Sequence, residues 1–128
     1  MIRNIILTLS LVYASTSIYA VSFPDISVED LQKAISSKKV AVIDVNGPKS
    51  FANGHIPGAI EFSVQKKKLQ SLLPKNKDTL VVAYCGGPSC RAYLRGANAA
   101  AELGYTNVRH LSAGISGWKK AGQKVEKK

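Results

Sequence analysis

Two short apolar runs place the strongest limit on what this chain can fold into. They are "KVAVIDV" (39–45) and "TLVVAYC" (79–85), and each is an almost unbroken stretch of apolar residues. Strands of this kind are buried on both faces, as in a parallel sheet covered by helices. The two runs therefore predict the centre of such a sheet.

Helical patterns alternate with these strands. "SVEDLQKAIS" (27–36) opens with Ser27 as a helix N-cap, and Asp30 follows three residues later. Helices are also expected just before Gly54, over 65–73, over 91–103 and over 115–122, with short strands over 59–62 and 106–111. The alternation predicts one α/β domain over residues 21–128, with a parallel β-sheet flanked by helices on both faces.

The first twenty residues, "MIRNIILTLSLVYASTSIYA", have the pattern of a secretory signal. A lone cation at Arg3 precedes an apolar run of about 10 residues, against roughly 20 for a membrane span. Cleavage is expected after Ala20, and cleavage near Ser17 is the alternative because Ile18 is large for its position. We therefore expect a signal peptide over 1–20, a periplasmic or secreted protein, and no stable membrane insertion after its removal.

The chain is strongly basic, with a formal net charge of +10. Such an excess could attract nucleic acid, an acidic surface or a small anion. The two basic runs, "KKK" (66–68) and "KKAGQKVEKK" (119–128), lack the interleaved aromatic residues that stack on bases. We expect no nucleic-acid partner, and a general attraction for anions.

Both cysteines lie in the segment "VVAYCGGPSCR" (81–91). A disulfide between Cys85 and Cys90 would close a loop too small to add much entropic stability, so a chemical role is favoured. Cys85 follows a buried strand, where ligands bind in parallel sheets. Backbone N–H groups of the small residues after it can surround an anion, and the next helix adds its positive end, which favours a thiolate. Cys85 is the expected nucleophile, and the anion-binding residues expected around it are Gly86, Gly87, Pro88, Ser89, Cys90 and Arg91.

Three segments together resemble the family of rhodanese-like domains over nearly all of residues 21–128. They are "VIDVNGPKSFANGHIPGAIEF" (42–62), "VVAYCGG" (81–87) and "ELGYTNVRHLSAGISGW" (102–118). The resemblance implies a sulfurtransferase in which Cys85 takes a sulfane sulfur from a small anionic donor such as thiosulfate and holds it as a persulfide. A thiol or cyanide-like acceptor then removes that sulfur. We assign no cofactor and no metal, and we expect Asp44 and His55 to be structural supports.

The sequence departs from the family pattern in three ways. Asn46 stands where arginine is usual, the active-site loop is one residue longer than usual, and Cys90 is an additional cysteine. Five residues between Cys85 and Arg91 resemble the loop of cell-cycle dual-specificity phosphatases. This spacing raises phosphatase or arsenate reductase-like chemistry as an alternative. It is less favoured, because the loop offers no acid to protonate a leaving group.

Cys90 leaves a third class of function open. In a loop curled around an anion, positions five apart can come within the roughly 7 Å between Cα atoms that a disulfide needs. Cys90 is then either a small filler or a resolving thiol, and a resolving thiol would make the domain a periplasmic redox or sulfur-relay module. A zinc site that recruits His55 and His110 fits the cysteine spacing poorly.

Overall fold

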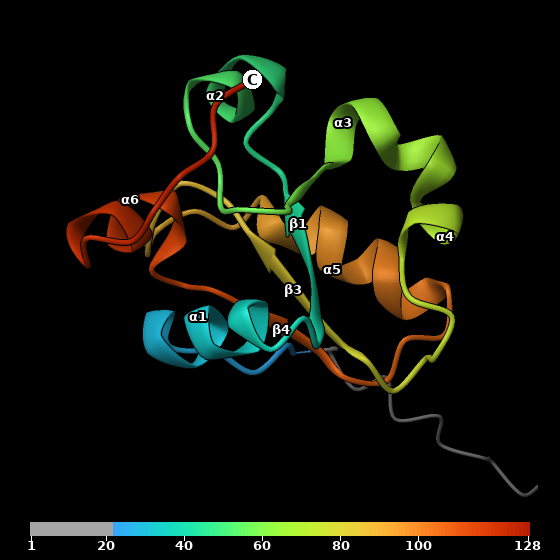
Figure 1. Ribbon diagram of the computed structural model, residues 1–128. Helices are drawn as coiled ribbons and strands as arrows, with labels where there is room; N and C mark the ends of the chain where they lie inside the picture. The colour runs from blue at the N-terminus through green and yellow to red at the C-terminus, as the bar shows by residue number, and fades with distance from the viewer. Residues whose placement is uncertain (1–21) are drawn as a thin grey trace, which may run out of the picture.

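The computed structural model describes residues 22–128, and this part of the chain contains one parallel sheet with the strand order β2-β1-β3-β4 (Figure 1). Its strands are β1 (Val40–Asp44), β2 (Ile60–Glu61), β3 (Leu80–Tyr84) and β4 (Val108–His110). β1 and β3 are central and pair along their whole length, from Val40 opposite Leu80 to Asp44 opposite Tyr84. The predicted parallel sheet is confirmed, and the two apolar runs form its centre.

Helices flank both faces of the sheet, as predicted. They are α1 (Val28–Ser36), α2 (Pro48–Asn53), α3 (Phe62–Gln65), the 3₁₀ turn η1 (Lys66–Lys68), α4 (Leu69–Leu72), α5 (Tyr93–Glu102) and α6 (Gly114–Lys120). On one face, α5 buries Ala97 and Ala100 in a core shared with α3 and α4. On the other face, α1 and α6 bury Leu31 and Trp118. Figure 1 shows α5 and α1 on opposite sides of β1 and β3.

The N-cap expected at Ser27 is present, because its hydroxyl oxygen accepts a hydrogen bond from the Asp30 N–H at 3.0 Å. The helix expected over 65–73 is instead divided into α3, η1 and α4. Its first turn starts earlier because the Glu61 carboxylate accepts hydrogen bonds from the Ser63 and Val64 N–H groups. Glutamate is not among the usual N-cap residues, which explains why the sequence pattern gave no sign of this start.

The helix expected over 91–103 begins two residues later, at Tyr93. The Leu94 N–H donates to the Arg91 carbonyl and the Arg95 N–H to the Ala92 carbonyl, both at 3.1 Å. Hydrogen bonds between residues three apart are those of a 3₁₀-type turn. The chain therefore leaves the loop after β3 through a tight turn before the regular helix starts.

The expected signal peptide over 1–20 lies outside the described residues. Within residues 22–128, no helix combines the length and apolar character that crossing a membrane requires. The same residues contain no group of three or more histidine, cysteine, aspartate or glutamate side chains arranged to hold a metal ion.

Candidate active site

Cys85 lies directly after β3, at the carboxyl end of the central strands. Its side chain belongs to the core between the sheet and α5, and the residue is 3% exposed. It forms a disulfide with Cys90, and the two Cα atoms are 6.3 Å apart. The structure therefore brings together the two cysteines of the sequence, in the geometry that a curled loop allows.

The start of α6 holds the first part of the loop. The Ile115 N–H donates to the Cys85 carbonyl and the Ser116 N–H to the Gly86 carbonyl, each at 3.0 Å. Gly114 has a φ of +60°, and a Cβ atom there would lie 2.5 Å from the backbone carbon of Gly86. Only glycine fits this contact, and the two hydrogen bonds turn the loop carbonyls towards α6.

Most N–H groups of the loop are left without a protein acceptor. One turn bond joins the Cys90 N–H to the Gly87 carbonyl at 3.1 Å. Within residues 22–128, no acceptor is found for the N–H groups of Gly86, Gly87, Ser89 and Arg91. Successive N–H groups without acceptors, in a loop that begins at a cysteine, are what an anion-binding nest requires.

Cys90 borders a cavity of about 360 Å³. The residues that line it are Pro88, Ser89, Cys90, Arg91, Tyr93, His110 and Ser112. Cys90 is partly buried, whereas Arg91 is exposed. The structure thus places the Arg91 side chain on the same cavity as Cys90.

Two of the lining residues, Tyr93 and His110, have stacked rings. Tyr93 lies on His110 with ring centroids 4.2 Å apart and planes 8° apart. His110 Nδ1 lies 2.8 Å from the Phe23 carbonyl oxygen. Since a carbonyl only accepts, Nδ1 carries the proton, and Nε2 lies 3.9 Å from Asp25 Oδ1. The Asp25 carboxylate accepts hydrogen bonds from the N–H and hydroxyl of Ser112 at 2.8 Å, which fixes this part of the lining.

Asp44, the last residue of β1, connects the ends of the two central strands by hydrogen bonds. Its Oδ1 accepts a hydrogen bond from the Asn46 N–H at 2.8 Å, and its Oδ2 accepts one from the Tyr84 hydroxyl. The Tyr84 oxygen in turn accepts from the Ile56 N–H at 3.0 Å. Burial raises the pKa of Asp44 although the Tyr84 bond opposes it, and burial together with the Asp44 charge raises the pKa of Tyr84.

His55 lies further from the loop, in the turn before β2. Its Nδ1 donates to the Phe51 carbonyl at 2.7 Å, and its ring stacks on Phe51 with centroids 3.6 Å apart. The backbone of His55 pairs with that of Glu126 in an antiparallel bridge, and Nε2 lies 3.5 Å from Glu126 Oε2. His55 therefore ties the C-terminal segment to this turn.

Asn46 lies beside the loop and lines two cavities. Its Oδ1 is 4.0 Å from the position that a Cβ of Gly86 would take. Its Nδ2 is buried and has no hydrogen-bond partner among the described residues. Lys66 and Arg95 line one of these cavities, and Lys49 and Lys119 line the other. The neighbourhood of Asn46 is therefore cationic.

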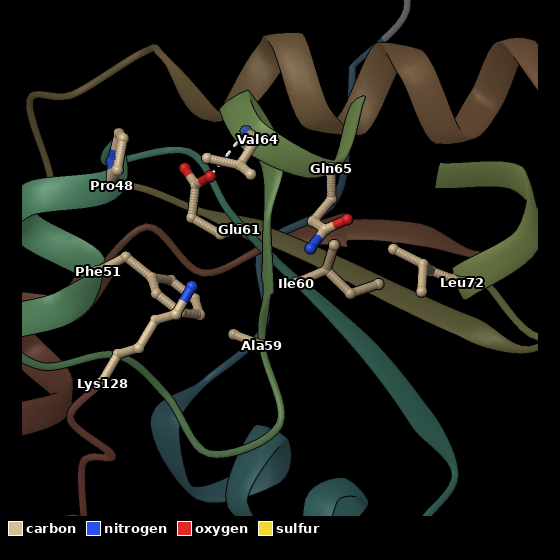
Figure 2. A pocket seen from close by; sticks show the side chains of 9 residues that line it. All are labelled: Pro48, Phe51, Ala59, Ile60, Glu61, Val64, Gln65, Leu72 and Lys128. Carbon is tan, nitrogen blue, oxygen red and sulfur yellow. Dashed lines mark hydrogen bonds between the residues drawn. The ribbon is translucent and has the colours of Figure 1, made fainter. Parts of the chain in front are cut away.

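A separate hollow of about 280 Å³ lies between α2, β2 and the α3–α4 segment, away from the loop (Figure 2). Phe51, Ile60 and Leu72 form much of its wall, and the Lys128 side chain lies along one side. Val64 and Leu72, which are 62% and 46% exposed, lie at this hollow. None of the loop residues borders it, so it adds no chemistry to the cysteine pair.

Three residues that shape the site had no clear signal in the sequence. Tyr84 was part of an apolar strand, and its hydrogen bond to Asp44 depends on the pairing of β1 with β3. Gly114 was one glycine among several, and its contact with Gly86 depends on where α6 packs. Tyr93 stacks on His110 across 17 positions, and only the polar character of "VRH" near a strand end could have suggested it.

Comparisons with known proteins identify the family of this chain. Residues 27–121 match the model of the rhodanese-like domain. Thiosulfate sulfurtransferase GlpE of Shewanella oneidensis is 32% identical over 103 residues, which cover 78% of this chain and 96% of the relative. Arsenate reductase 2.1 of rice (Oryza sativa subsp. japonica) is 34% identical over 110 residues, with 74% and 66% covered.

A solved structure gives the same result for the fold. The human single-domain sulfurtransferase TSTD1 superposes with a TM-score of 0.61 at 25% identity, over 77% of this chain and 97% of that one. The parallel sheet, the loop after β3 and the family match over residues 27–121 lead to one conclusion. This chain belongs to the family of rhodanese-like domains.

Proposed function

We propose that this protein is a sulfurtransferase that carries a sulfane sulfur as a persulfide on Cys85. The observation that carries the proposal is the position of Cys85 at the carboxyl end of β3, followed by a loop whose N–H groups lack protein acceptors. The relative named thiosulfate sulfurtransferase, which this chain matches over 96% of its length, supports the same activity. A sulfur-transfer role uses both features, because the nucleophile and the persulfide that it becomes are anions.

The reaction has two steps. The Cys85 thiolate attacks the outer sulfur of thiosulfate, a Cys85–S–S⁻ persulfide forms, and the electron pair of the broken S–S bond leaves with sulfite. A thiol or cyanide-like acceptor then attacks the outer persulfide sulfur and returns Cys85 to the thiolate. The loop N–H groups donate hydrogen bonds to the terminal sulfur in the intermediate state. No cofactor takes part in either step.

The disulfide to Cys90 favours a second candidate function. In the oxidised form Cys85 is not a nucleophile, so transfer requires prior reduction. A domain that alternates between these forms serves as a thiol redox or sulfur-relay module, in which Cys90 resolves the persulfide. Cys90→Ala distinguishes the two functions: in a relay it prolongs the life of the Cys85 persulfide, and in a turnover enzyme it does not.

The test of the first function is thiocyanate formation by the reduced protein from thiosulfate and cyanide. Cys85→Ser should abolish it, because a hydroxyl is too weakly acidic to replace the thiolate. Full activity in that variant would reject the assignment. Arsenate is the control substrate, since the rice relative is named an arsenate reductase. Turnover of arsenate without thiocyanate formation would favour that alternative.

The proposal includes export, with residues 1–20 removed as a signal. An oxidising compartment favours a disulfide between Cys85 and Cys90, and a cytosolic one favours the dithiol. Expression of the full chain in a bacterium, followed by N-terminal sequencing of the protein in the periplasmic fraction, tests this part. A protein that retains residue 1 and stays in the cytosolic fraction would refute it.

A further inference from the structure

The two cysteines of the disulfide are not equally exposed. Cys85 is 3% exposed and packs in the core with residues of β3 and α5. Cys90 is partly exposed and forms part of the wall of the cavity of about 360 Å³. Thiol–disulfide exchange depends on which sulfur an attacking thiolate can reach. On this basis we expect an external thiolate to reach Cys90 more easily than Cys85.

The cavity beside Cys90 suits a ligand with a negative charge. Of the described residues that line it, Arg91 carries the only permanent charge, and its side chain is exposed. Ser89 and Ser112 add hydroxyl groups. No aspartate or glutamate is among these lining residues, and the two carboxylate oxygens of Asp25, outside the lining, accept hydrogen bonds from Ser112. A carboxylate on the ligand could therefore pair with Arg91, since no acidic side chain in the lining competes for the guanidinium.

We propose that this cavity receives an anionic low-molecular-weight thiol, which opens the disulfide by attacking Cys90 and thereby releases Cys85. The attacking thiolate forms a new S–S bond to Cys90, the Cys85–Cys90 bond breaks, and its electron pair stays on Cys85 as a thiolate. A second thiolate then attacks the sulfur of the first thiol in the mixed disulfide. The bond between that sulfur and Cys90 breaks, and Cys90 leaves as a thiolate. The two thiol molecules are joined in one disulfide, and their oxidation supplies the two electrons that reduce the protein.

The direction of attack decides what the first step produces. Attack on Cys90 leaves the nucleophile of the proposed function free after one exchange. Attack on Cys85 would instead block that nucleophile with the incoming thiol until a second exchange. The inference rests on the proposed role of Cys85, but the site of attack is measurable without any sulfur transfer.

The first experiment maps the mixed disulfide. The oxidised full chain is treated briefly with glutathione, free thiolates are trapped with iodoacetamide, and the protein is digested with trypsin. Both cysteines then lie on the peptide Asp78–Arg91, and fragment ions that break between Gly86 and Ser89 separate them. We expect glutathione on Cys90 and the alkyl group on Cys85, in at least about tenfold excess over the reverse arrangement. An even distribution, or glutathione mainly on Cys85, would overturn the proposal.

The second experiment tests the role of charge. Rates of disulfide opening, expressed per thiolate, are compared for glutathione and for uncharged 2-mercaptoethanol. Arg91→Ala should slow glutathione about three- to tenfold and leave 2-mercaptoethanol within about twofold. Arg109→Ala is the matched control, because Arg109 is also an exposed arginine but does not line the cavity. Equal effects on both thiols, or none from Arg91→Ala, would reject the anionic ligand.

The two experiments also separate this inference from the function beneath it. If glutathione maps to Cys90 but thiocyanate is never formed, the sulfurtransferase assignment fails and the thiol site stands. If thiocyanate is formed but glutathione maps to Cys85, the thiol site fails and the enzyme stands.

Discussion

Gly114 meets the backbone of Gly86 so closely that no side chain fits between them. A Cβ on Gly114 would lie 2.5 Å from the Gly86 carbonyl carbon and 2.7 Å from its oxygen. The N-terminal turn of α6 and the loop after Cys85 therefore form one packed unit, and the position of the loop depends on a residue 28 positions further along the chain.

Gly114→Ala should displace the loop and lower sulfur transfer by about tenfold or more, because misplacing reacting groups by about 1 Å can reduce rates about a hundredfold. The measurement is kcat for thiocyanate formation. Gly104→Ala is the matched control, since Gly104 also has a positive φ, of +95°, but nothing lies within 4 Å of its added Cβ. The control should lose about 1–2 kcal/mol of stability and keep its kcat. A similar kcat loss in both variants would contradict the role assigned to Gly114.

Tyr84→Phe should lower the free energy of unfolding by about 1–3 kcal/mol. The change leaves Asp44 Oδ2 and the Ile56 N–H without their buried partner. Urea unfolding of the reduced protein measures the effect. Tyr105→Phe is the comparison, because its hydroxyl donates to the Pro74 carbonyl in a partly buried place, and it should cost about 0.5–1.5 kcal/mol. A larger loss for Tyr105→Phe would show that the Asp44 network contributes little.

Asp44 should make the protein less stable as the pH rises above the ordinary range of a carboxyl group. Its pKa is raised in the folded state, mainly by burial, so between the unfolded and folded pKa values the folded chain binds more protons than the unfolded chain. The free energy of unfolding then falls with increasing pH in that window.

The matched measurement is the difference in unfolding free energy between Asp44→Asn and the parent protein, followed from pH 4 upwards. Other titrating groups largely cancel in this difference. It should shift in favour of Asp44→Asn as the pH rises and then level off. A shift in favour of the parent would mean that hydrogen bonds, not burial, control the charge of Asp44.

Asn46→Ala should leave the protein as stable as the parent or raise its unfolding free energy by up to about 1 kcal/mol. Its Nδ2 is buried without a partner among the described residues, and such a group costs about 1–3 kcal/mol. Thermal unfolding measures the change. Asn53→Ala is the control, because Asn53 lines one of the same cavities but has no buried polar atom without a hydrogen-bond partner. A loss of more than about 1 kcal/mol in Asn46→Ala alone would show that its amide is paired in solution.

The sequence was sufficient for the features that depend on local patterns. The apolar runs that end at Asp44 and Cys85 predicted the parallel sheet, and the glycine-rich segment after Cys85 predicted a loop with free N–H groups. These features follow from strand burial and from backbone geometry within a few residues. The nucleophilic role of Cys85 and the anion-binding role of the loop stay predictions.

The remaining features depend on distances in the fold that one sequence does not contain. The hydrogen bond from Tyr84 to Asp44 joins residues 40 positions apart and needs the register of β1 with β3. The cavity beside Cys90 forms because the fold brings His110 of β4 next to the turn before α5. The early start of α3 needed a glutamate to act as a cap, which the usual preferences do not predict.

The pairing of His55 with Glu126 has a consequence for the order in which the chain folds. The turn that leads into β2 completes its backbone hydrogen bonds with residues 71 positions later, and Asp25 similarly bridges to His110. Contacts between such distant positions form late and lower the folding rate, because much loop entropy is lost before they are made. A nascent chain that has not yet reached Glu126 therefore lacks both backbone hydrogen bonds that hold the turn at His55.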